Sequence, residues 1–318
     1  MPTNLIKKDV ITALAARAAG LDNREGNPRL KQVVNRLLIE LMTAIDDLDI
    51  SMNEFWSGVA YLTQVGKHNE FGLVVPGVVL EHFLDLRLDE AERRAGLASG
   101  TVRTIEGPLY IAGAPLSKGE ARLDDGTDQG EVLFMEGQVR DVSGKPVAGA
   151  MVDVWHANTM GNYSHFDPTQ AAYNLRRRIE TDKDGRYRFR SIMPSGYACP
   201  PGSQTEKLLH AMGRHGNRPA HVHFFVTAPG YRKLTTQINI DGDKYLHDDF
   251  AFGTRDDLIP QVQRVTEAAE IHKAGLNKPF ARIQFDFVIV EETAGAPSSS
   301  VEREHAAAAY KNTQPRRR

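Results

Sequence analysis

Cysteine is almost absent from this chain of 318 residues, in which Cys199 is the only one. A single thiol excludes an intramolecular disulfide and a zinc site built from several thiolates. The sequence therefore favours a reducing compartment, and we expect a cytoplasmic protein. Any metal that it binds must use nitrogen and oxygen ligands.

Long apolar runs and an excess of charge are missing as well. The longest apolar run, Phe71 to Leu80, contains Pro76 and falls far short of the roughly twenty residues that span a bilayer. Asp9 and Arg17 interrupt the apolar start of the chain, so we expect no signal peptide. Lys and Arg total 39 against 41 Asp and Glu, which favours neither nucleic acid nor an acidic membrane. We expect a small or neutral partner.

Residues 1–104 have helical patterns. Asn27 is placed to cap a helix that Pro28 opens, and apolar residues then recur at helical spacing as far as Ile45. Ser51 and Glu54 match a capping box before another helix, and "LDEAERRAG" predicts a third. We predict a helical N-terminal domain whose apolar surplus meets the next domain or a second subunit.

Residues 105–290 change to strand-like alternation with Gly, Pro and Asp between the runs, as in "DKDGRYRFRSI". This pattern predicts a mainly β fold, an antiparallel β-sandwich, interrupted by one helix near 254–275. The consecutive arginines 176–178 are expected at a solvated or ion-paired strand edge. Residues 291–318 are low in apolar content and are expected to form a loose tail.

The stretch "RPAHVHFF" places two histidines one residue apart in an apolar strand. Residues i and i+2 of a strand point to the same side, so His221 and His223 can grip one ion, with Val222 and Phe224 facing away. Two core histidines hydrogen-bonded to the backbone would give the same pattern. The motif alone does not separate these readings.

Two tyrosines also follow strands, in loops that contain glycine. Tyr163 lies in "NTMGNYSHF" and Tyr197 in "MPSGYACPPG". Each could be an amphipathic ring with a hydrogen-bonded hydroxyl. If the two tyrosines converge with the histidines, however, the mixture of phenolate and imidazole suits a hard trivalent ion better than zinc, and ferric iron is favoured.

Several phrases in this order resemble the intradiol ring-cleavage dioxygenases, and within that family the catechol 1,2-dioxygenase type. They are "TIEGPLYIAGAP", "VDVWHAN", "NLRRRI", "RSIMPSGY", "RPAHVHF" and "LTTQI". The resemblance covers roughly residues 1–290. It implies cleavage of catechol by O2 to cis,cis-muconate, in the degradation of aromatic compounds, by one non-haem Fe(III) per subunit.

The resemblance also implies roles for individual residues. The metal ligands are Tyr163, Tyr197, His221 and His223. Tyr197 is in addition the group that accepts a proton from the substrate, while Arg218 stabilises negative charge on the ring and Gln237 assists through its amide. Residues that contact the substrate are Leu73, Pro76, Ile105, Pro108, Leu109, Arg218, Phe250 and Ala251. Leu73 and Ala251 bear on the preference for catechol or chlorocatechol.

The implied partners are catechol and O2, and a second copy of the chain. The resemblance implies a homodimer joined through the N-terminal helices, which enclose an apolar channel that phospholipid can occupy. His156, beside Trp155, is expected to be structural and not a fifth ligand.

Three other functions compete with this one. Chlorocatechol and hydroxyquinol 1,2-dioxygenases share the ligand pattern. A non-catalytic β-sandwich module of the carboxypeptidase-regulatory or adhesin type shares the strand pattern of residues 137–152 and 182–189, but has no reason to hold two tyrosines and two histidines. A zinc hydrolase is disfavoured because no Glu or Asp accompanies the histidine motif.

Overall fold

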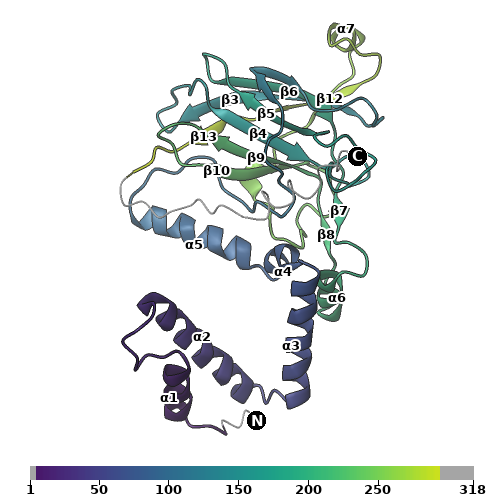
Figure 1. Ribbon diagram of the computed structural model, residues 1–318. Coiled ribbons are helices and arrows are strands. Elements are labelled where there is room, and N and C mark those ends of the chain that lie inside the picture. The colour runs from purple at the N-terminus through teal and green to yellow at the C-terminus, as the bar shows by residue number, and fades with distance from the viewer. Residues whose placement is uncertain (1–4, 294–318) are drawn as a thin grey trace, which may run out of the picture. The chain divides into compact units, whose positions relative to one another are not determined.

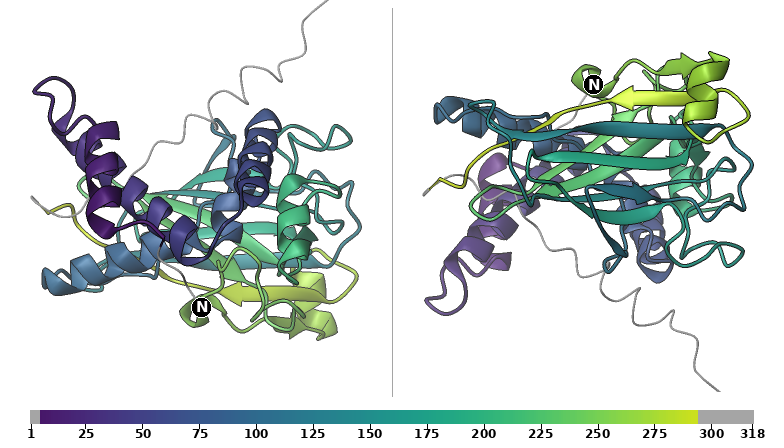
Figure 2. Two further views of the ribbon diagram at one scale, coloured as in Figure 1. Left: turned by 90° about the horizontal axis from the view of Figure 1, so that it is seen from below. Right: turned by 90° about the horizontal axis from the view of Figure 1, so that it is seen from above.

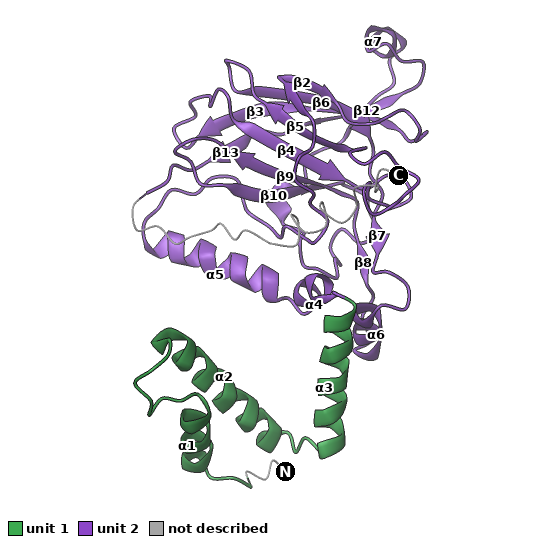
Figure 3. Ribbon diagram, in the orientation of Figure 1, with its two compact units in different colours: residues 1–68 green, residues 69–318 purple. Residues whose placement is uncertain are grey.

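The computed structural model describes residues 5–293 and contains two compact units, one that ends at His68 and one that begins at Asn69. Figure 3 distinguishes the two units by colour. The predicted loose tail at 291–318 lies almost entirely outside the described residues.

The first unit consists of helices. They are α1 (Lys8–Ala18), α2 (Pro28–Asp47) and α3 (Met52–Lys67). Asn27 accepts hydrogen bonds from the amides of Arg29 and Leu30, and the capping box of Ser51 and Glu54 is formed in both directions. The two predicted helix starts are therefore confirmed.

The second unit begins with two further helices and continues as a β-sandwich (Figure 1, Figure 2). The helices are α4 (Phe71–Gly77) and α5 (Leu80–Arg94), so part of the predicted helical domain belongs to the compact unit that holds the sheets. One sheet has the strand order β1-β5-β4-β9-β10 and the other β11-β12-β3-β6-β2.

The strands of the first sheet are β1 (Leu116–Lys118), β4 (Met151–His156), β5 (Arg176–Glu180), β9 (His221–Thr227) and β10 (Leu234–Asn239). Those of the second are β2 (Glu120–Arg122), β3 (Val132–Asp141), β6 (Arg186–Ile192), β11 (Gln263–Val265) and β12 (Phe280–Gln284), with β13 (Phe287–Ile289) paired to β3. A separate ribbon joins β7 (Tyr197–Ala198) and β8 (Asn217–Arg218), next to α6 (Gln204–Ala211).

The core lies between the two sheets, where alternate residues of the strands meet. Val152 and Val154 of β4 and Val222 and Phe224 of β9 are fully buried there, against Phe189 of β6 and other apolar residues. Burial of this surface is the main stabilising contribution to the sandwich. The same alternation sends the other residues of β4 and β9 to the outer face of the first sheet.

The expected sandwich is confirmed, but its sheets are mixed and not purely antiparallel. β1 pairs with β5, β2 with β6, and both β12 and β13 with β3 in parallel. These strands join their partners through long connections, so no tight turn forces the antiparallel direction.

The predicted helix near 254–275 is wrong for most of its length. The segment holds a short 3-10 helix η1 (Asp256–Leu258), the strand β11 and a six-residue helix α7 (Ala268–Lys273). Pro260 provides no amide for a helix. Val265 instead packs with Phe134 and Phe280 as part of the sheet.

The expectation for the three arginines is also wrong at Arg176. β5 lies between β1 and β4, and Arg176 is only 1% exposed. Its guanidinium donates to the Ser164 hydroxyl, to the Ser164 carbonyl and to the Leu109 carbonyl. Arg178 donates to the carbonyl of Ala114.

Candidate metal and substrate site

The site is built on the outer face of the first sheet. β9 runs between β4 and β10, with Trp155 and Gln237 directly opposite His223 on either side. The Trp155 ring stacks on the His223 ring, with the centroids 4.9 Å apart and the planes at 6°. Both histidines are 1% exposed, while Val222 and Phe224 face the core as predicted.

The two predicted tyrosines come to the same place from different segments. Tyr163 lies in the loop after β4, and Tyr197 lies in β7, opposite Arg218 of β8. The hydroxyl of Tyr163 is 3.4 Å from Nε2 of His221, and its ring centroid is 5.5 Å from that of Tyr197. The Tyr197 and His221 centroids are 5.6 Å apart. The structure thus brings together all four residues that were predicted to bind metal.

Gly161 permits this approach of the two tyrosine segments. Its φ is +79°, and a Cβ there would lie 2.9 Å from the Gly196 carbonyl oxygen and 2.9 Å from Cβ of Tyr197. Any other residue would clash as well as be strained.

The histidine nitrogens are arranged as metal ligands would be. The Nδ1–H group of His221 donates to the Pro219 carbonyl at 2.7 Å, which leaves the Nε2 lone pair directed inward. Nε2 of His223 lies 3.0 Å from Nε2 of His221. Burial, and secondarily Arg218, lowers the pKa of His221 to about 3, and burial also lowers the pKa of His223. Two neutral rings thus aim at one point.

The tyrosine environment gives a second indication of a cation. Burial, with a further contribution from Tyr197, raises the pKa of Tyr163 well above its usual value, against the opposing charge of Arg218. A phenolate here needs a positive charge close to its oxygen, as a bound metal provides. Between residues 5 and 293, no three His, Cys, Asp or Glu side chains are grouped to hold a metal. Two phenol oxygens and two imidazole nitrogens fit the expected non-haem ferric ion by their donor chemistry.

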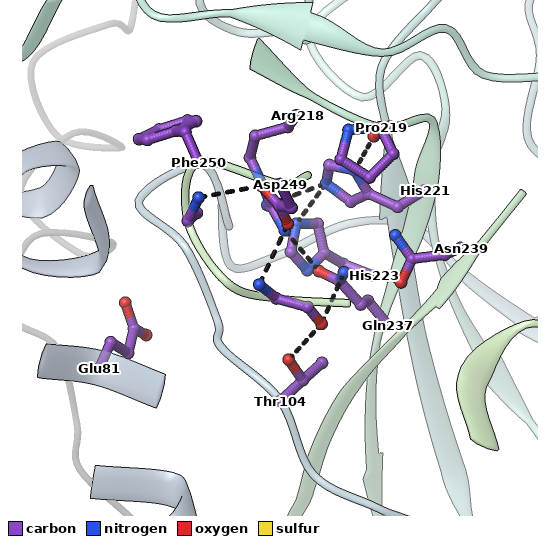
Figure 4. Close-up of polar contacts among 12 residues, drawn as sticks. Glu81, Thr104, Arg218, Pro219, His221, His223, Gln237, Asn239, Asp249 and Phe250 are labelled. Atoms are coloured by element: carbon purple, nitrogen blue, oxygen red, sulfur yellow. Dashed lines mark hydrogen bonds and ion pairs between the residues drawn. The ribbon is translucent and has the colours of Figure 1, made fainter. Parts of the chain in front are cut away.

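Arg218 and Gln237 lie beside the histidines (Figure 4). Arg218 is 3% exposed, and its Nη1 is 3.1 Å from Nε2 of His221. Its Nη2 donates to Oε1 of Gln237 at 2.9 Å. The Gln237 amide nitrogen donates to Asn239 and to the Gly253 carbonyl. Both residues are therefore held in one orientation next to the histidine nitrogen atoms.

An acidic partner of Arg218 was not found by sequence reasoning. Asp249, 7% exposed, pairs with the guanidinium at 3.0 Å. Burial alone would lower the pKa of Arg218, but the Asp249 carboxylate raises it, so the arginine is cationic. The available signal was the position of this aspartate directly before the predicted contact residues Phe250 and Ala251.

The predicted substrate contacts surround the same region. Ile105, Phe250 and Ala251 belong to one buried cluster, and Leu109 packs against the cluster of Trp155 and Tyr163. Leu73 and Pro76 lie on α4, half-buried and buried. The same helix approaches Pro108 at Gly72 and Phe250 at Gly77, where added Cβ atoms would lie 3.1 and 3.5 Å from those side chains.

Two further features lie near the site without joining it. Both ring nitrogens of His156 are hydrogen-bonded, to the Ala157 carbonyl and the Ser191 hydroxyl, which agrees with a structural histidine. A cavity of about 900 Å³ lies between α5 and the segment around 97–106 and shares Ile105 with the predicted substrate contacts. None of the four predicted metal ligands lines it.

The chain matches two family models. Residues 105–291 match the model described as "Dioxygenase", and residues 27–96 match "Catechol dioxygenase N terminus". A chain named catechol 1,2-dioxygenase 2, from Acinetobacter lwoffii, is 58% identical over 269 residues, which are 85% of this chain and 96% of the relative.

The similarity extends to solved structures. The crystal structure of wild-type Acinetobacter radioresistens catechol 1,2 dioxygenase has a TM-score of 0.89 and 53% identity, and the alignment covers 95% of this chain and 98% of that one. More distant is the chlorocatechol 1,2-dioxygenase of Rhodococcus opacus, at 35% identity over 73% of this chain and 93% of the relative. A hydroxyquinol 1,2-dioxygenase from a Rhizobium species has 34% identity over 83% of this chain and 90% of the relative.

In the part of the chain that the structure describes, no helix is long and apolar enough to cross a membrane.

Proposed function

Because the chain belongs to the intradiol ring-cleavage dioxygenase family, we propose that it cleaves catechol with O2 to cis,cis-muconate. The observation that carries the proposal is the convergence of Tyr163, Tyr197, His221 and His223 on one buried point. The family match favours an enzyme over a non-catalytic sandwich module. The greater identity to relatives named for catechol favours that substrate over chlorocatechol and hydroxyquinol.

The four converging residues would hold one non-haem Fe(III). When bound, the ion would receive both diol oxygens and make the ring reactive toward O2. Two anionic phenolates and two neutral imidazoles match the charge and hardness of that ion.

The two tyrosines differ in burial and in the structure around them, which suits different roles in the reaction. Tyr163 is 4% exposed, and the Arg176 guanidinium lies over its ring, 5.7 Å from the centroid. Tyr197 is half-buried and belongs to a ribbon of only two short strands. We infer that Tyr163 is the fixed ligand and that Tyr197 accepts the substrate proton at its hydroxyl oxygen.

Arg218 and Gln237 would act on the ring. The guanidinium is charged, buried and held beside His221, so it can stabilise negative charge that develops on the bound diol. Gln237 fixes one edge of that guanidinium and would assist through its amide. Ile105, Phe250 and Ala251 would form an apolar wall that excludes water.

Colour and product together test this function. The iron-loaded protein should be red to burgundy from charge transfer between tyrosinate and Fe(III), and the Tyr163→Phe variant should lose much of the visible band. Catechol and O2 should give a product with the ultraviolet absorbance of muconate. A colourless protein with one iron per chain would contradict the ligand set, and a yellow semialdehyde would indicate the wrong cleavage position.

We propose in addition that residues 1–104 mediate a homodimer. The helix α2 has no buried residue, and its apolar side chains Leu30, Val33, Leu37 and Leu41 are exposed in the single chain. Apolar surface of this kind is typical of subunit contacts and could also hold phospholipid within the dimer. The single buried cysteine supports a cytoplasmic location.

Light scattering tests the dimer. The wild-type protein should have twice the chain mass, whereas a Leu37→Glu and Leu41→Glu double variant should be a monomer. Gln32→Glu, at an exposed position on another face of the same helix, is the matched control. A wild-type monomer would contradict the proposal. Mass spectrometry of an organic extract would detect the lipid.

A further inference from the structure

Asp249 is the centre of a buried hydrogen-bond network on one side of the site (Figure 4). Its side chain is 1% exposed. Its Oδ1 accepts from Nε of Arg218 at 3.1 Å, and its Oδ2 accepts from Nη2 of Arg218 at 3.0 Å. An aspartate buried to this degree needs a cation and several donors, and both are present.

The pair fixes the direction in which the guanidinium points. Nε and Nη2 face Asp249, Nη2 also donates to Gln237, and Nη1 faces His221. Among residues 5–293, Asp249 is the carboxylate that lies within ion-pair distance of Arg218. Arginine has several rotatable bonds, so without this partner the planar group is free to leave the orientation that faces His221.

The loop that follows Asp249 holds the carboxylate in place. The amide of Ala251 donates to Oδ1 at 3.0 Å, and the amide of Gly253 donates to Oδ2 at 3.1 Å. Phe252 between them has φ of +55°, the left-handed conformation that this tight turn requires. The Gly253 carbonyl accepts from Thr104 and Gln237, which anchors the far end of the loop.

We propose that Asp249 is a positioning residue for ring cleavage, which acts by holding the Arg218 guanidinium against the substrate. This inference rests on the proposed function and adds a residue to which the sequence motifs gave no role. It makes the loop 249–253 serve two purposes: its side chains line the apolar wall, and its amides orient the carboxylate that orients the arginine.

The test is a double-mutant cycle on the iron-loaded protein with catechol. Asp249→Asn keeps the size of the side chain but removes the charge and one acceptor. We expect kcat to fall by about 10- to 100-fold, by analogy with the loss of one preorganised electrostatic group. Because Asp249 acts through Arg218, adding Asp249→Asn to Arg218→Gln should lower kcat less than about twofold further.

The matched control is Asp248→Asn, the exposed neighbour that pairs with His215. It should change kcat less than twofold. The visible band of the Asp249→Asn variant should keep its position and intensity, because the four metal ligands remain. Additive losses in the cycle, or a kcat equal to that of Asp248→Asn, would overturn the proposal.

A second variant approaches the guanidinium from another direction. A Cβ on Gly253 would lie 2.4 Å from Nη2 of Arg218, 3.1 Å from Oδ2 of Asp249 and 3.1 Å from Nε2 of Gln237. Gly253→Ala therefore displaces the pair without removing a charge, and it should also lower kcat at least tenfold with the visible band unchanged. Normal kcat in this variant would refute the positioning role even if Asp249→Asn fails to fold. Wild-type protein that cleaves no catechol would instead refute the proposed function.

Discussion

Asp85 provides a prediction about stability that does not depend on the catalytic site. This residue of α5 lines the 900 Å³ cavity, and its Oδ2 is buried without a hydrogen-bond partner among the described residues. Burial, with the nearby Glu81 carboxylate second, raises the pKa of Asp85 from 3.8 to about 7, against the opposing charge of Arg103. The carboxyl should therefore be protonated in the folded protein over a pH range in which the unfolded chain has lost the proton.

The sign follows from proton linkage. The folded state binds the proton more tightly, so the stability linked to Asp85 is present below about pH 4 and is lost as the pH rises through 7. One unit of pKa difference is worth about 1.4 kcal/mol. Relative to acid pH, this linkage lowers the stability by about 1.7 kcal/mol at pH 5 and by about 4 kcal/mol at pH 8. Water at the cavity mouth screens part of this, and we expect a change of about 1–2 kcal/mol between the two pH values.

The assay is urea denaturation of the wild type and the Asp85→Asn variant from pH 5 to pH 8. Asparagine mimics the neutral carboxyl, so the stability advantage of the variant should grow by about 1–2 kcal/mol across this range. Asp241→Asn, at an exposed position, is the control and should show no such trend. Parallel pH profiles for Asp85→Asn and the wild type would refute the reasoning.

Three further substitutions test the packing of the sandwich core and of the segment beside the site. Phe224→Ala, in the fully buried core, should lower the free energy of unfolding by about 3–5 kcal/mol in urea denaturation, and a loss under 1 kcal/mol would contradict the packing. Gly137→Ala would place a Cβ 1.7 Å from the Phe285 carbonyl oxygen, so we expect little soluble folded protein, and a normal melting temperature would disprove this contact. Gly107 has φ of +68° and lies next to His223. Gly107→Ala should therefore cost about 1–2 kcal/mol of stability and shift the visible band of the iron-loaded protein, whereas an unchanged band would show that the segment does not shape the site.

The residues of the site were predictable because they lie on regular structure or in distinctive phrases. The spacing of His221 and His223 indicates one strand face, and the core packing of Val222 and Phe224 confirms that alternation. The convergence of Tyr163 and Tyr197 with them came from the family resemblance. Spacing alone could not join segments that are tens of residues apart in the chain.

The errors arose where tertiary contacts override local pattern. Three consecutive arginines look solvated, yet Arg176 is buried because the hydroxyl and carbonyl of Ser164 and the carbonyl of Leu109 accept its hydrogen bonds. Residues 254–275 have a helical composition, but residues 263–265 form the strand β11, which pairs with β12. Asp249 was missed although it directly precedes two predicted contact residues, since its importance depends on Arg218, which is distant in sequence.

The position of β9 affects the rate at which its backbone amides exchange with solvent. This strand is hydrogen-bonded along its length to β10 on one side and β4 on the other, so its amides should be among the slowest to exchange with deuterium. The amides of the loop 249–253 bond mostly to Asp249 within the loop, and the amide of Phe250 donates to a strand, at the Asn217 carbonyl of β8. This loop should therefore open by smaller, local fluctuations. Exchange measurements should therefore find His221 and His223 in the last part of the molecule to open, and Phe250 and Ala251 in a part that opens more readily.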